Sequence, residues 1–177
     1  MPARSSAPRS TSGGRRYGFA TVADGPVYRA VFIRMHPTGK AVLSLSEASQ
    51  GTEGELAATA AGELGIPPED VKVVHEDTDR FGVGNSFNAA PSDVVGENVA
   101  ITARKLRDKA HLIAALMLDA SPDSVQWDAG HWSAGEASVR MQEVSLRAFG
   151  SDALPEGVEG SLDAQTTYRL DAAPQTA

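Results

Sequence analysis

The sequence predicts a single α/β (α+β) domain, in which helices pack on a small mixed sheet, and three observations lead to this fold class. Two short runs rich in β-branched residues and leucine, 31–35 and 41–46, flank a Pro-Thr-Gly turn and predict a β-hairpin. A helical segment at 53–64 leads through a short connection to a third strand at 71–75. A long amphipathic segment at 93–118 then predicts a helix that covers the sheet.

The hairpin turn is indicated by Pro37 and Gly39, because proline presets and glycine permits the backbone angles of a tight turn. In the second run, Val42 and Leu45 point to different faces of the strand. Neither face is then plainly polar, so we expect both faces of the sheet to be covered by other elements.

The segment 53–64 has the signals of a helix start and a helix stop. Thr52 or Ser49 can cap its N-terminus, and Glu53 lies in the first turn, where the helix dipole favours an acid. Gly65 and the two prolines that follow predict its end. Its apolar side consists of leucines and alanines at helical spacing: Leu56, Ala57, Ala60, Ala61 and Leu64.

Residues 77–91 are rich in glycine and asparagine and predict a long loop, of the kind that is usually functional or disordered. The helix after this loop is the best-defined element, because its apolar residues follow one another at steps of three or four. They are Val95, Val99, Ala103, Leu106, Ala110, Ile113 and Met117. Ser92 or Asp93 can cap the start of the helix.

A second, smaller hairpin is predicted at 125–128 and 131–133, with tryptophans near its ends. The segment 138–149 predicts a last helix. From residue 151 the chain is acidic and weakly periodic, and we expect it to cross the surface and to fray after Leu170.

Composition bounds the domain organisation. The chain has 177 residues, 41% of them hydrophobic, which suits one domain with its own core. Residues 1–16 carry four arginines, no acid and no apolar block, and predict a disordered basic tail rather than a secretory signal. We therefore expect a single domain over 17–170, with a frayed C-terminus at 171–177.

Charge and residue usage exclude several functional classes. The chain has 16 basic and 23 acidic residues; without the four arginines of the tail, 12 basic and 23 acidic residues remain, a net charge of −11. An acidic body repels phosphate backbones, so we expect no binding of nucleic acid. No apolar run approaches the roughly 18 residues of a membrane span, and a cytoplasmic location is expected in the absence of another address. Because the chain has no cysteine, it holds no disulfide, iron–sulfur cluster or thiolate metal site.

The turn Gln50-Gly51-Thr52-Glu53 is the first candidate binding site. Backbone amides at a helix N-terminus, together with the helix dipole, favour an anion such as a phosphate or the edge of a pterin. Gly51 permits close approach to the backbone, and the Gln50 amide offers a donor and an acceptor. An ordinary helix cap explains the same four residues, and the spacing alone does not separate the two interpretations.

The remaining polar residues have structural explanations. The four histidines have no pair at metal-ligand spacing, and we expect them to be solvated or hydrogen-bonded: His36, His75, His111 and His131. The acidic group of Glu76, Asp77 and Asp79 could coordinate a cation, although capping and loop roles explain it equally. Acid–base catalysis in a cleft between Glu53 and Asp77 is a further alternative that no spacing singles out.

Four segments in the same order resemble one known family. They are HPTGKAVL at 36–43, LGIPPEDVKVVHEDTD at 64–79, ARKLRDKA at 103–110 and LPEGVEGSLDA at 154–164. The sequence is similar over about 25–170 to part of the large, molybdopterin-binding subunit of the molybdenum hydroxylases (the xanthine dehydrogenase and aldehyde oxidase family), and most like the aerobic carbon monoxide dehydrogenases. The resemblance implies a portion of a molybdopterin-binding domain.

Half of the first cofactor-binding motif is present. The family typically has Q-G-Q-G-H-E-T before this helix, and Gln50, Gly51 and Glu53 match its second glutamine, second glycine and glutamate. Ala48 and Ser49 stand where the first Gln-Gly pair would be, and Thr52 replaces the histidine. The resemblance implies cofactor contacts from Gln50 to Glu53.

The second loop departs further from the family, which usually has G-T-Y-G-S-R-S-T after the D-T-D. Here the segment 85–92 reads NSFNAAPS, and Ser86, Phe87 and Asn88 are the positions to which cofactor contacts carry over. Ala90 stands where the arginine would be, and a charge-assisted contact to phosphate of this kind is worth about 1.5–3 kcal/mol.

The resemblance implies the cofactor molybdopterin cytosine dinucleotide, bound with the help of other molybdenum hydroxylase subunits or of the missing part of the large subunit. The implied reaction is oxidative hydroxylation with water as the oxygen source, catalysed by residues outside this slice, so we assign no catalytic residue and no metal ligand and expect no activity of the chain alone. The alternative is a stand-alone binding or assembly module on the same scaffold, without redox activity.

Overall fold

The computed structural model describes residues 27–46, 51–81, 92–150 and 153–170. Its main sheet has the strand order β3-β2-β1-β7. The strands are β1 (Val27–Met35), β2 (Ala41–Leu45), β3 (Val71–Val74) and β7 (Asp163–Leu170). Strand β1 is antiparallel to β2 and β7, whereas β2 and β3 are parallel, so the sheet is mixed. The predicted fold class, a small mixed sheet with packed helices, is confirmed.

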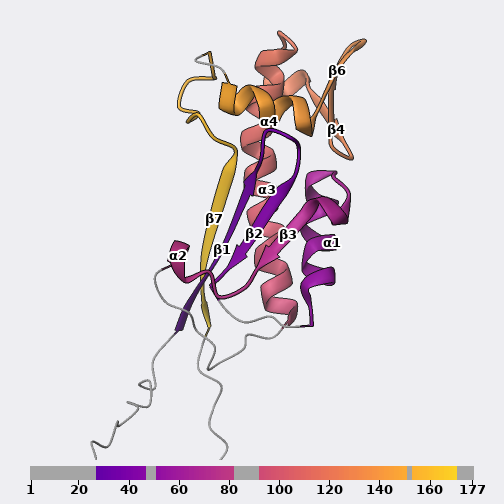
Figure 1. Ribbon diagram of the computed structural model, residues 1–177. Coiled ribbons are helices and arrows are strands. Elements are labelled where there is room, and N and C mark those ends of the chain that lie inside the picture. Colours follow the sequence, from indigo (N-terminus) through magenta and orange to yellow (C-terminus); the bar gives the residue numbers. More distant parts are fainter. Residues whose placement is uncertain (1–26, 47–50, 82–91, 151–152, 171–177) are drawn as a thin grey trace, which may run out of the picture.

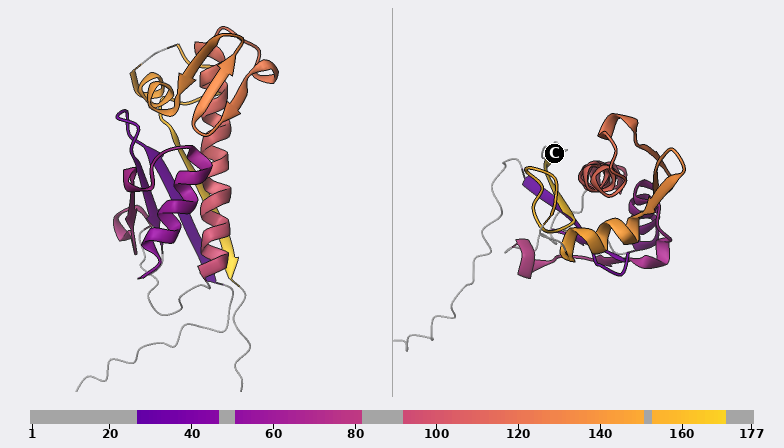
Figure 2. Two further views of the ribbon diagram at one scale, coloured as in Figure 1. Left: turned by 90° about the vertical axis from the view of Figure 1, so that its right-hand side faces the viewer. Right: turned by 90° about the horizontal axis from the view of Figure 1, so that it is seen from above.

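Two helices cover one face of this sheet. Helices α1 (Glu53–Leu64) and α3 (Ser92–Met117) lie side by side behind the strands of Figure 1, and both views of Figure 2 agree with this placement. The core fills the space between the sheet and these helices. The strand residues that face the helices are almost fully buried: Val31, Ile33, Met35, Ala41, Leu43 and Leu45.

The other face of the sheet is only partly covered. The short helix α2 (Thr78–Phe81) lies on this face, and the guanidinium of Arg80 stacks 3.8 Å from the ring centroid of Phe32. Arg34 on the same face is exposed, and Val42 is half-buried. The expectation that both faces are covered therefore holds fully for the helical side and partly for the other.

Helix α1 has the predicted bounds and the predicted buried side. Its C-cap Gly65 has a left-handed backbone, φ 64°, as expected for a glycine stop. Its N-cap is Thr52, one of the two predicted residues, although the Thr52 side chain makes no capping hydrogen bond; Ser49, the other, lies outside the described residues. The Glu53 carboxylate, in the first turn of the helix, accepts a hydrogen bond from the Gly51 amide at 2.8 Å.

Helix α3 begins and ends one residue earlier than predicted. Six of the seven residues of its expected apolar stripe are buried, and Met117 at its end is half-buried. Two buried polar side chains bond within the helix: the Thr102 hydroxyl donates to the Asn98 carbonyl at 2.7 Å, and the Asn98 amide donates to the Val94 carbonyl at 2.9 Å. These bonds let polar residues lie inside the domain.

A second, three-stranded sheet lies at the far end of α3. It consists of β4 (Gln126–Asp128), β5 (His131–Ala134) and β6 (Ala137–Arg140), and helix α4 (Met141–Gly150) follows directly. The small hairpin is confirmed, with Trp127 paired opposite Trp132. The predicted start of the last helix at Ser138 is wrong, because residues 137–140 pair with β5 and the helix begins only at Met141.

Strand β7 contradicts the expectation that the chain merely crosses the surface after residue 151. Over Asp163–Leu170 it pairs with residues Val27–Arg34 of β1. The signal was present in Thr166, Thr167 and Tyr168, since β-branched and aromatic residues favour strands. The predicted fraying beyond Leu170 and the predicted tail at 1–16 lie outside the described residues.

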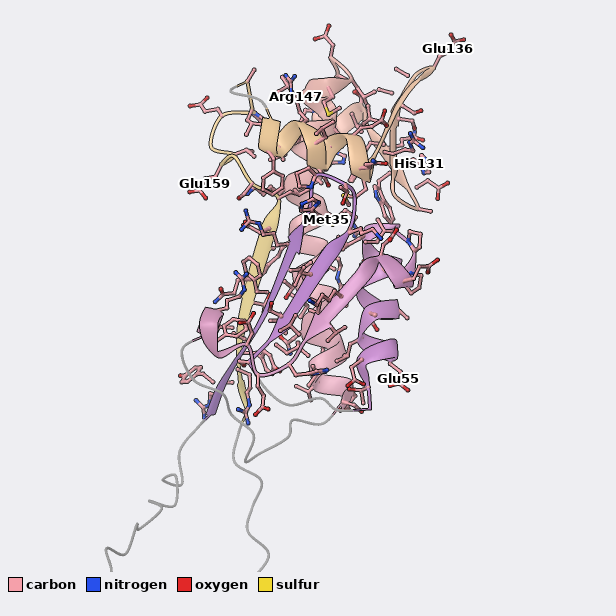
Figure 3. All side chains as sticks on the ribbon, viewed as in Figure 1. Met35, Glu55, His131, Glu136, Arg147 and Glu159 are labelled. Atoms are coloured by element: carbon pink, nitrogen blue, oxygen red, sulfur yellow. The ribbon has the colours of Figure 1, made fainter. Side chains whose placement is uncertain are left out.

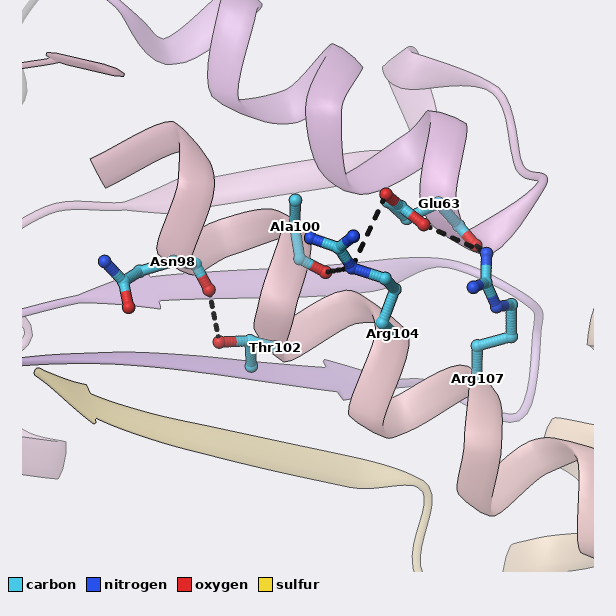
Figure 4. Close-up of polar contacts among 6 residues, drawn as sticks. All are labelled: Glu63, Asn98, Ala100, Thr102, Arg104 and Arg107. Carbon is cyan, nitrogen blue, oxygen red and sulfur yellow. Dashed lines mark hydrogen bonds and ion pairs between the residues drawn. The ribbon is translucent and has the colours of Figure 1, made fainter. Parts of the chain in front are cut away.

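A group of side chains joins α1, α3 and the small sheet. The Arg107 guanidinium donates to the Glu63 carboxylate at 2.9 Å and stacks 4.4 Å from the ring centroid of Trp127. Arg104 lies further away, with Nε 3.8 Å from the same carboxylate (Figure 4). We call Glu63, Arg107 and Trp127 the clamp. Two short 3₁₀ turns, Pro68–Asp70 and Pro122–Ser124, complete the connections.

Within the ranges that the structure describes, no helix combines the length and the apolar character that crossing a membrane requires. Figure 3 shows that charged side chains such as Glu55, Glu136 and Glu159 project from the outside of the domain, while Met35 lies inside.

Candidate functional site

The two predicted loops begin and end at one edge of the main sheet. The parallel strands β2 and β3 both finish at this edge, and helices α1 and α3 both start from it, as Figure 1 shows at the bottom of the view. Residues 47–50 join β2 to α1, and residues 82–91 join α2 to α3. The carboxyl ends of parallel strands are a common place for ligands in α/β sheets. We call this end of the molecule the loop edge.

Of the seven candidate residues, three lie within the described part of the chain: Gly51, Thr52 and Glu53, which form the start of α1. Gln50 from the first motif, and Ser86, Phe87 and Asn88 from the second, lie outside the described residues. The structure thus brings the ends of both loops to the loop edge, while the cofactor contacts implied for Gln50 and Phe87 stay predictions.

Gly51 has the backbone conformation that its residue type allows. Its φ is 86°, a value that residues with a side chain rarely adopt, and its backbone is exposed. A Cβ added at Gly51 would meet no atom within 4 Å, so the space beside this turn is open. A ligand can therefore approach the main chain here without displacing another part of the described structure.

Glu53 is the centre of the described turn. One carboxylate oxygen accepts the Gly51 N–H, and the other lies 3.1 Å from Nε2 of His75, at the end of β3. A hydrogen bond from its own backbone amide, opposed by slight desolvation and aided by the Gly51 amide and His75, holds the pKa of Glu53 below its ordinary value. Glu53 is therefore a carboxylate at neutral pH, even though 44% of its side chain is exposed.

The position of Glu53 changes the chemistry that this helix start offers. The amides that would attract a free anion already face a carboxylate from the chain itself. The following amides, Gly54 and Glu55, remain in the first turn, where no earlier carbonyl is available within the helix. A second negative charge next to Glu53 is disfavoured, whereas a group that carries N–H donors can bond to the carboxylate.

His75 is the functional neighbour that the sequence did not single out. It was expected to be a solvated or hydrogen-bonded histidine, and its bond to Glu53 places it in the candidate site. The contact joins residues 22 positions apart, through the parallel pairing of β2 and β3. No local pattern in the sequence reports such a contact, although both residues were noted separately.

Asp77 has a structural role at the same edge. It accepts the Arg80 amide at 3.1 Å and faces Nε of Arg80 at 3.5 Å. Desolvation pushes its pKa upward, but the neighbouring Ser44 hydroxyl and the Arg80 amide and guanidinium outweigh this and hold the pKa below its ordinary value. Because Glu53 and Asp77 are both ionised at neutral pH, neither can serve there as a general acid, and the acid–base alternative gains no support.

A groove of about 360 Å³ opens on the partly covered face of the sheet, also near the loop edge. Arg29, Ser46 and Arg80 contribute to its lining, with Phe81 at one side. The described residues of its lining include two arginines and no carboxylate. Among the described residues, no group of three or more histidines and acids comes together as a metal site.

Comparison with known proteins gives consistent matches. Residues 10–177 match the family described as the molybdopterin cofactor-binding domain. The carbon monoxide dehydrogenase large chain of Afipia carboxidovorans is 32% identical over 143 residues, which are 77% of this chain and 17% of that protein. The 6-hydroxypseudooxynicotine dehydrogenase complex subunit gamma of Paenarthrobacter nicotinovorans is 30% identical over 131 residues, 72% of this chain and 16% of that protein.

Solved structures show the same likeness. A crystal structure of the Cu,Mo-CO dehydrogenase in its carbon monoxide reduced state aligns with a TM-score of 0.70 and 28% identity, over 84% of this chain and 19% of the other. Quinoline 2-oxidoreductase from Pseudomonas putida 86 aligns with a TM-score of 0.64 and 26% identity, over 80% and 19% of the two chains. These matches confirm the resemblance found in the sequence, and they show that the chain spans less than a fifth of the length of these relatives.

Proposed function

Because the chain belongs to the molybdopterin cofactor-binding domain family, we propose that it forms one wall of a molybdopterin site and contributes no catalytic residue of its own. The form of the cofactor that we propose is molybdopterin cytosine dinucleotide. Its binding residues in this chain are Gln50, Gly51, Thr52 and Glu53 from the first loop, and Ser86, Phe87 and Asn88 from the second.

The observation that carries this proposal is the start of α1. The turn is open, its glycine exposes the main chain, and Glu53 is held ionised at its centre. A pterin presents an amino group and a ring N–H along one edge, and a cytosine presents an amino group beside two acceptor atoms; both edges match a carboxylate acceptor flanked by amide donors. The described half of the site therefore fits the nitrogen-rich parts of the cofactor better than it fits a bare phosphate.

The roles of the residues follow from these contacts. Glu53 would accept N–H groups of the ligand, and the Gly54 and Glu55 amides would donate to its oxygen or ring nitrogen atoms. His75 would hold the Glu53 carboxylate in place through the 3.1 Å contact. When bound, the cofactor would supply the redox chemistry of oxidative hydroxylation with water as the oxygen source, and this chain would orient it.

We further propose that the chain acts as part of a larger assembly. The relatives are about six times longer than the segment they share with this chain. Other molybdenum hydroxylase subunits, or further parts of a large subunit, would complete the site and provide the reacting groups, in the cytoplasm. The substrate would be set by those parts.

A stand-alone binding or assembly module is the second candidate, and one observation favours it. Glu53 already bonds to the Gly51 amide and contacts His75, so both of its carboxylate oxygens have partners without any ligand. Such a module would keep the scaffold of the family and would not retain the cofactor.

Purification of the full chain from its native host separates the two candidates. Molybdenum measured by mass spectrometry, and cytidine nucleotide released by acid, should both accompany the wild-type chain in near-equal amounts. A Glu53→Ala variant should lose both. The control is Glu55→Ala, an exposed position two residues further along the same turn, which keeps its backbone amide and should keep both the molybdenum and the nucleotide. Folded wild-type chain without metal and nucleotide would favour the stand-alone module.

A further inference from the structure

Among the described residues, no strand pairs with the outer edge of strand β7. In the order β3-β2-β1-β7 it is an edge strand, and among the described residues it pairs only with β1. It has eight residues and contains neither a proline nor a glycine. Long regular edges of this kind are templates for a further strand.

The register shows which backbone groups point outward. The Met35 amide donates to the Leu162 carbonyl at 2.8 Å, and the next pair along the register is Arg34 with Asp163. Hydrogen-bonded and non-hydrogen-bonded pairs alternate in an antiparallel ladder, so even-numbered residues of β7 bond to β1 and odd-numbered residues face away. The Gln165 carbonyl agrees with this direction, because it accepts a hydrogen bond from the Lys105 ammonium of α3 at 3.3 Å.

We propose that a second copy of this chain docks on this edge, β7 against β7 and antiparallel, and joins the two sheets into one of eight strands. One register brings all four outward-facing residues of each strand into hydrogen-bonded pairs. In this register Asp163 lies opposite Arg169 of the second copy, Gln165 lies opposite Thr167 of the second copy, and the two Thr166 residues meet at the two-fold axis.

Charge complementarity supports this occupant. Asp163 and Arg169 lie on the same face of β7, and the two-fold axis converts them into two opposite-charge pairs across the interface. Within each sheet, Asp163 is already opposite Arg34 and Arg169 is opposite Tyr28. The dimer therefore extends a row of side chains in which an acid stands between two arginines.

Lys105 opposes the same association. Besides the Gln165 carbonyl, its ammonium contacts the Thr166 hydroxyl at 3.1 Å, so the two Lys105 side chains of a dimer would meet near the axis. Lysine at an edge is a common means of limiting strand pairing. The dimer should therefore be weak, with a dissociation constant on the order of 10–100 µM, and removal of this charge should strengthen it.

An apolar surface elsewhere on the domain provides the competing explanation for any dimer. Leu112, Leu116 and Leu146 are exposed where α3 meets α4, beside a cavity of about 430 Å³ lined in part by Met117 and Arg147. The structure gives no register or charge pairing that selects an occupant for this surface. It therefore serves as the control in the test of the β7 edge.

Sedimentation equilibrium of the purified full chain tests the proposal. Thr167→Pro removes an outward amide that bonds only across the dimer, so the chain should stay folded and become monomeric, whereas Thr167→Val should keep the wild-type dimer. Asp163→Arg and Arg169→Asp should each weaken association roughly tenfold, and the double variant should restore it. Lys105→Gln should tighten it several-fold.

Three outcomes would overturn the proposal. A wild-type chain that stays monomeric at about 1 mM would show that no second copy binds this edge. A dimer that survives Thr167→Pro but is abolished by Leu146→Glu would place the contact at α3 and α4. Failure of the double charge variant to recover would refute the register. Because none of these measurements involves molybdenum or nucleotide, they stand or fall separately from the proposed cofactor site.

Discussion

The two ends of helix α1 are built in opposite ways. At its C-terminus, the backbone of Gly65 touches that of Gly130, and Glu63 forms the clamp with Arg107 and Trp127. At its N-terminus, Gly51 is exposed with open space beside it, and Glu53 has one amide and one histidine as neighbours. The difference teaches that this scaffold is closely packed where it joins its small sheet and open where we propose that a ligand binds.

The largest loss of stability is expected from Gly65→Ala, at the closely packed C-terminus of α1. The new Cβ would lie 2.0 Å from the Gly130 amide nitrogen, and the residue would keep a φ of 64° that disfavours a side chain. We expect a loss of about 3 kcal/mol or more in the free energy of unfolding, measured by urea denaturation.

Gly62→Ala in the same helix is the matched control. A Cβ at Gly62 meets nothing within 4 Å, and alanine is a better helix former than glycine. This variant should gain about 0.5–1 kcal/mol. Equal effects of the two substitutions would contradict the close packing at Gly65.

The next largest loss of stability is expected from a substitution in the clamp. Arg107→Gln removes both the bond to Glu63 and the stacking on Trp127, and about a quarter of each charged side chain is exposed, so solvent screens part of the ion pair. We expect a loss of about 1–2 kcal/mol in the same denaturation measurement.

Arg104→Gln, which removes the 3.8 Å contact of a more exposed side chain, should cost less than about 0.5 kcal/mol. If the two arginine variants proved equally stable, the clamp would not be the element that joins α1 to the small sheet.

The smallest expected effect on stability comes from protonation of Glu53 at low pH, at the N-terminus of α1. The folded-state pKa of Glu53 is lowered, so its contribution to stability is present above the pKa of the unfolded chain and is lost as pH falls through the folded-state value. A carboxyl-carbon NMR titration should place the Glu53 midpoint below that of the same residue in the urea-unfolded chain. A midpoint at or above the unfolded value would show that the contacts to Gly51 and His75 do not form.

The same contrast explains what the sequence could predict. Helices α1 and α3 follow from periodicities within one segment, and Gly65 marks a stop by its residue type alone. Strands β6 and β7 were missed because their stability comes from partners elsewhere: β6 depends on β5, and β7 on a strand more than a hundred residues earlier. Weak local patterns are overruled by such pairing.

The candidate site likewise has a part that the sequence predicted and a part that it did not. The turn at 50–53 was recognisable from a glycine before a helix and from its match to a family motif. The contacts of Glu53 with the Gly51 amide and His75 were not, because they depend on the Glu53 rotamer and on a residue that follows β3, 22 positions away. Family motifs locate a site, whereas the groups already satisfied within it decide which part of a ligand it favours.

The central claim is that the α1 turn accepts the nitrogen-rich edge of a pterin or a cytosine. Amide NMR spectra of the full chain, titrated with pterin-6-carboxylate and separately with cytidine diphosphate, test it most directly. We predict shifts that begin at Gly51, Gly54 and Glu55 and are lost in Glu53→Ala. Shifts confined to α4 and the small sheet, or saturable binding that Glu53→Ala leaves unchanged, would contradict it.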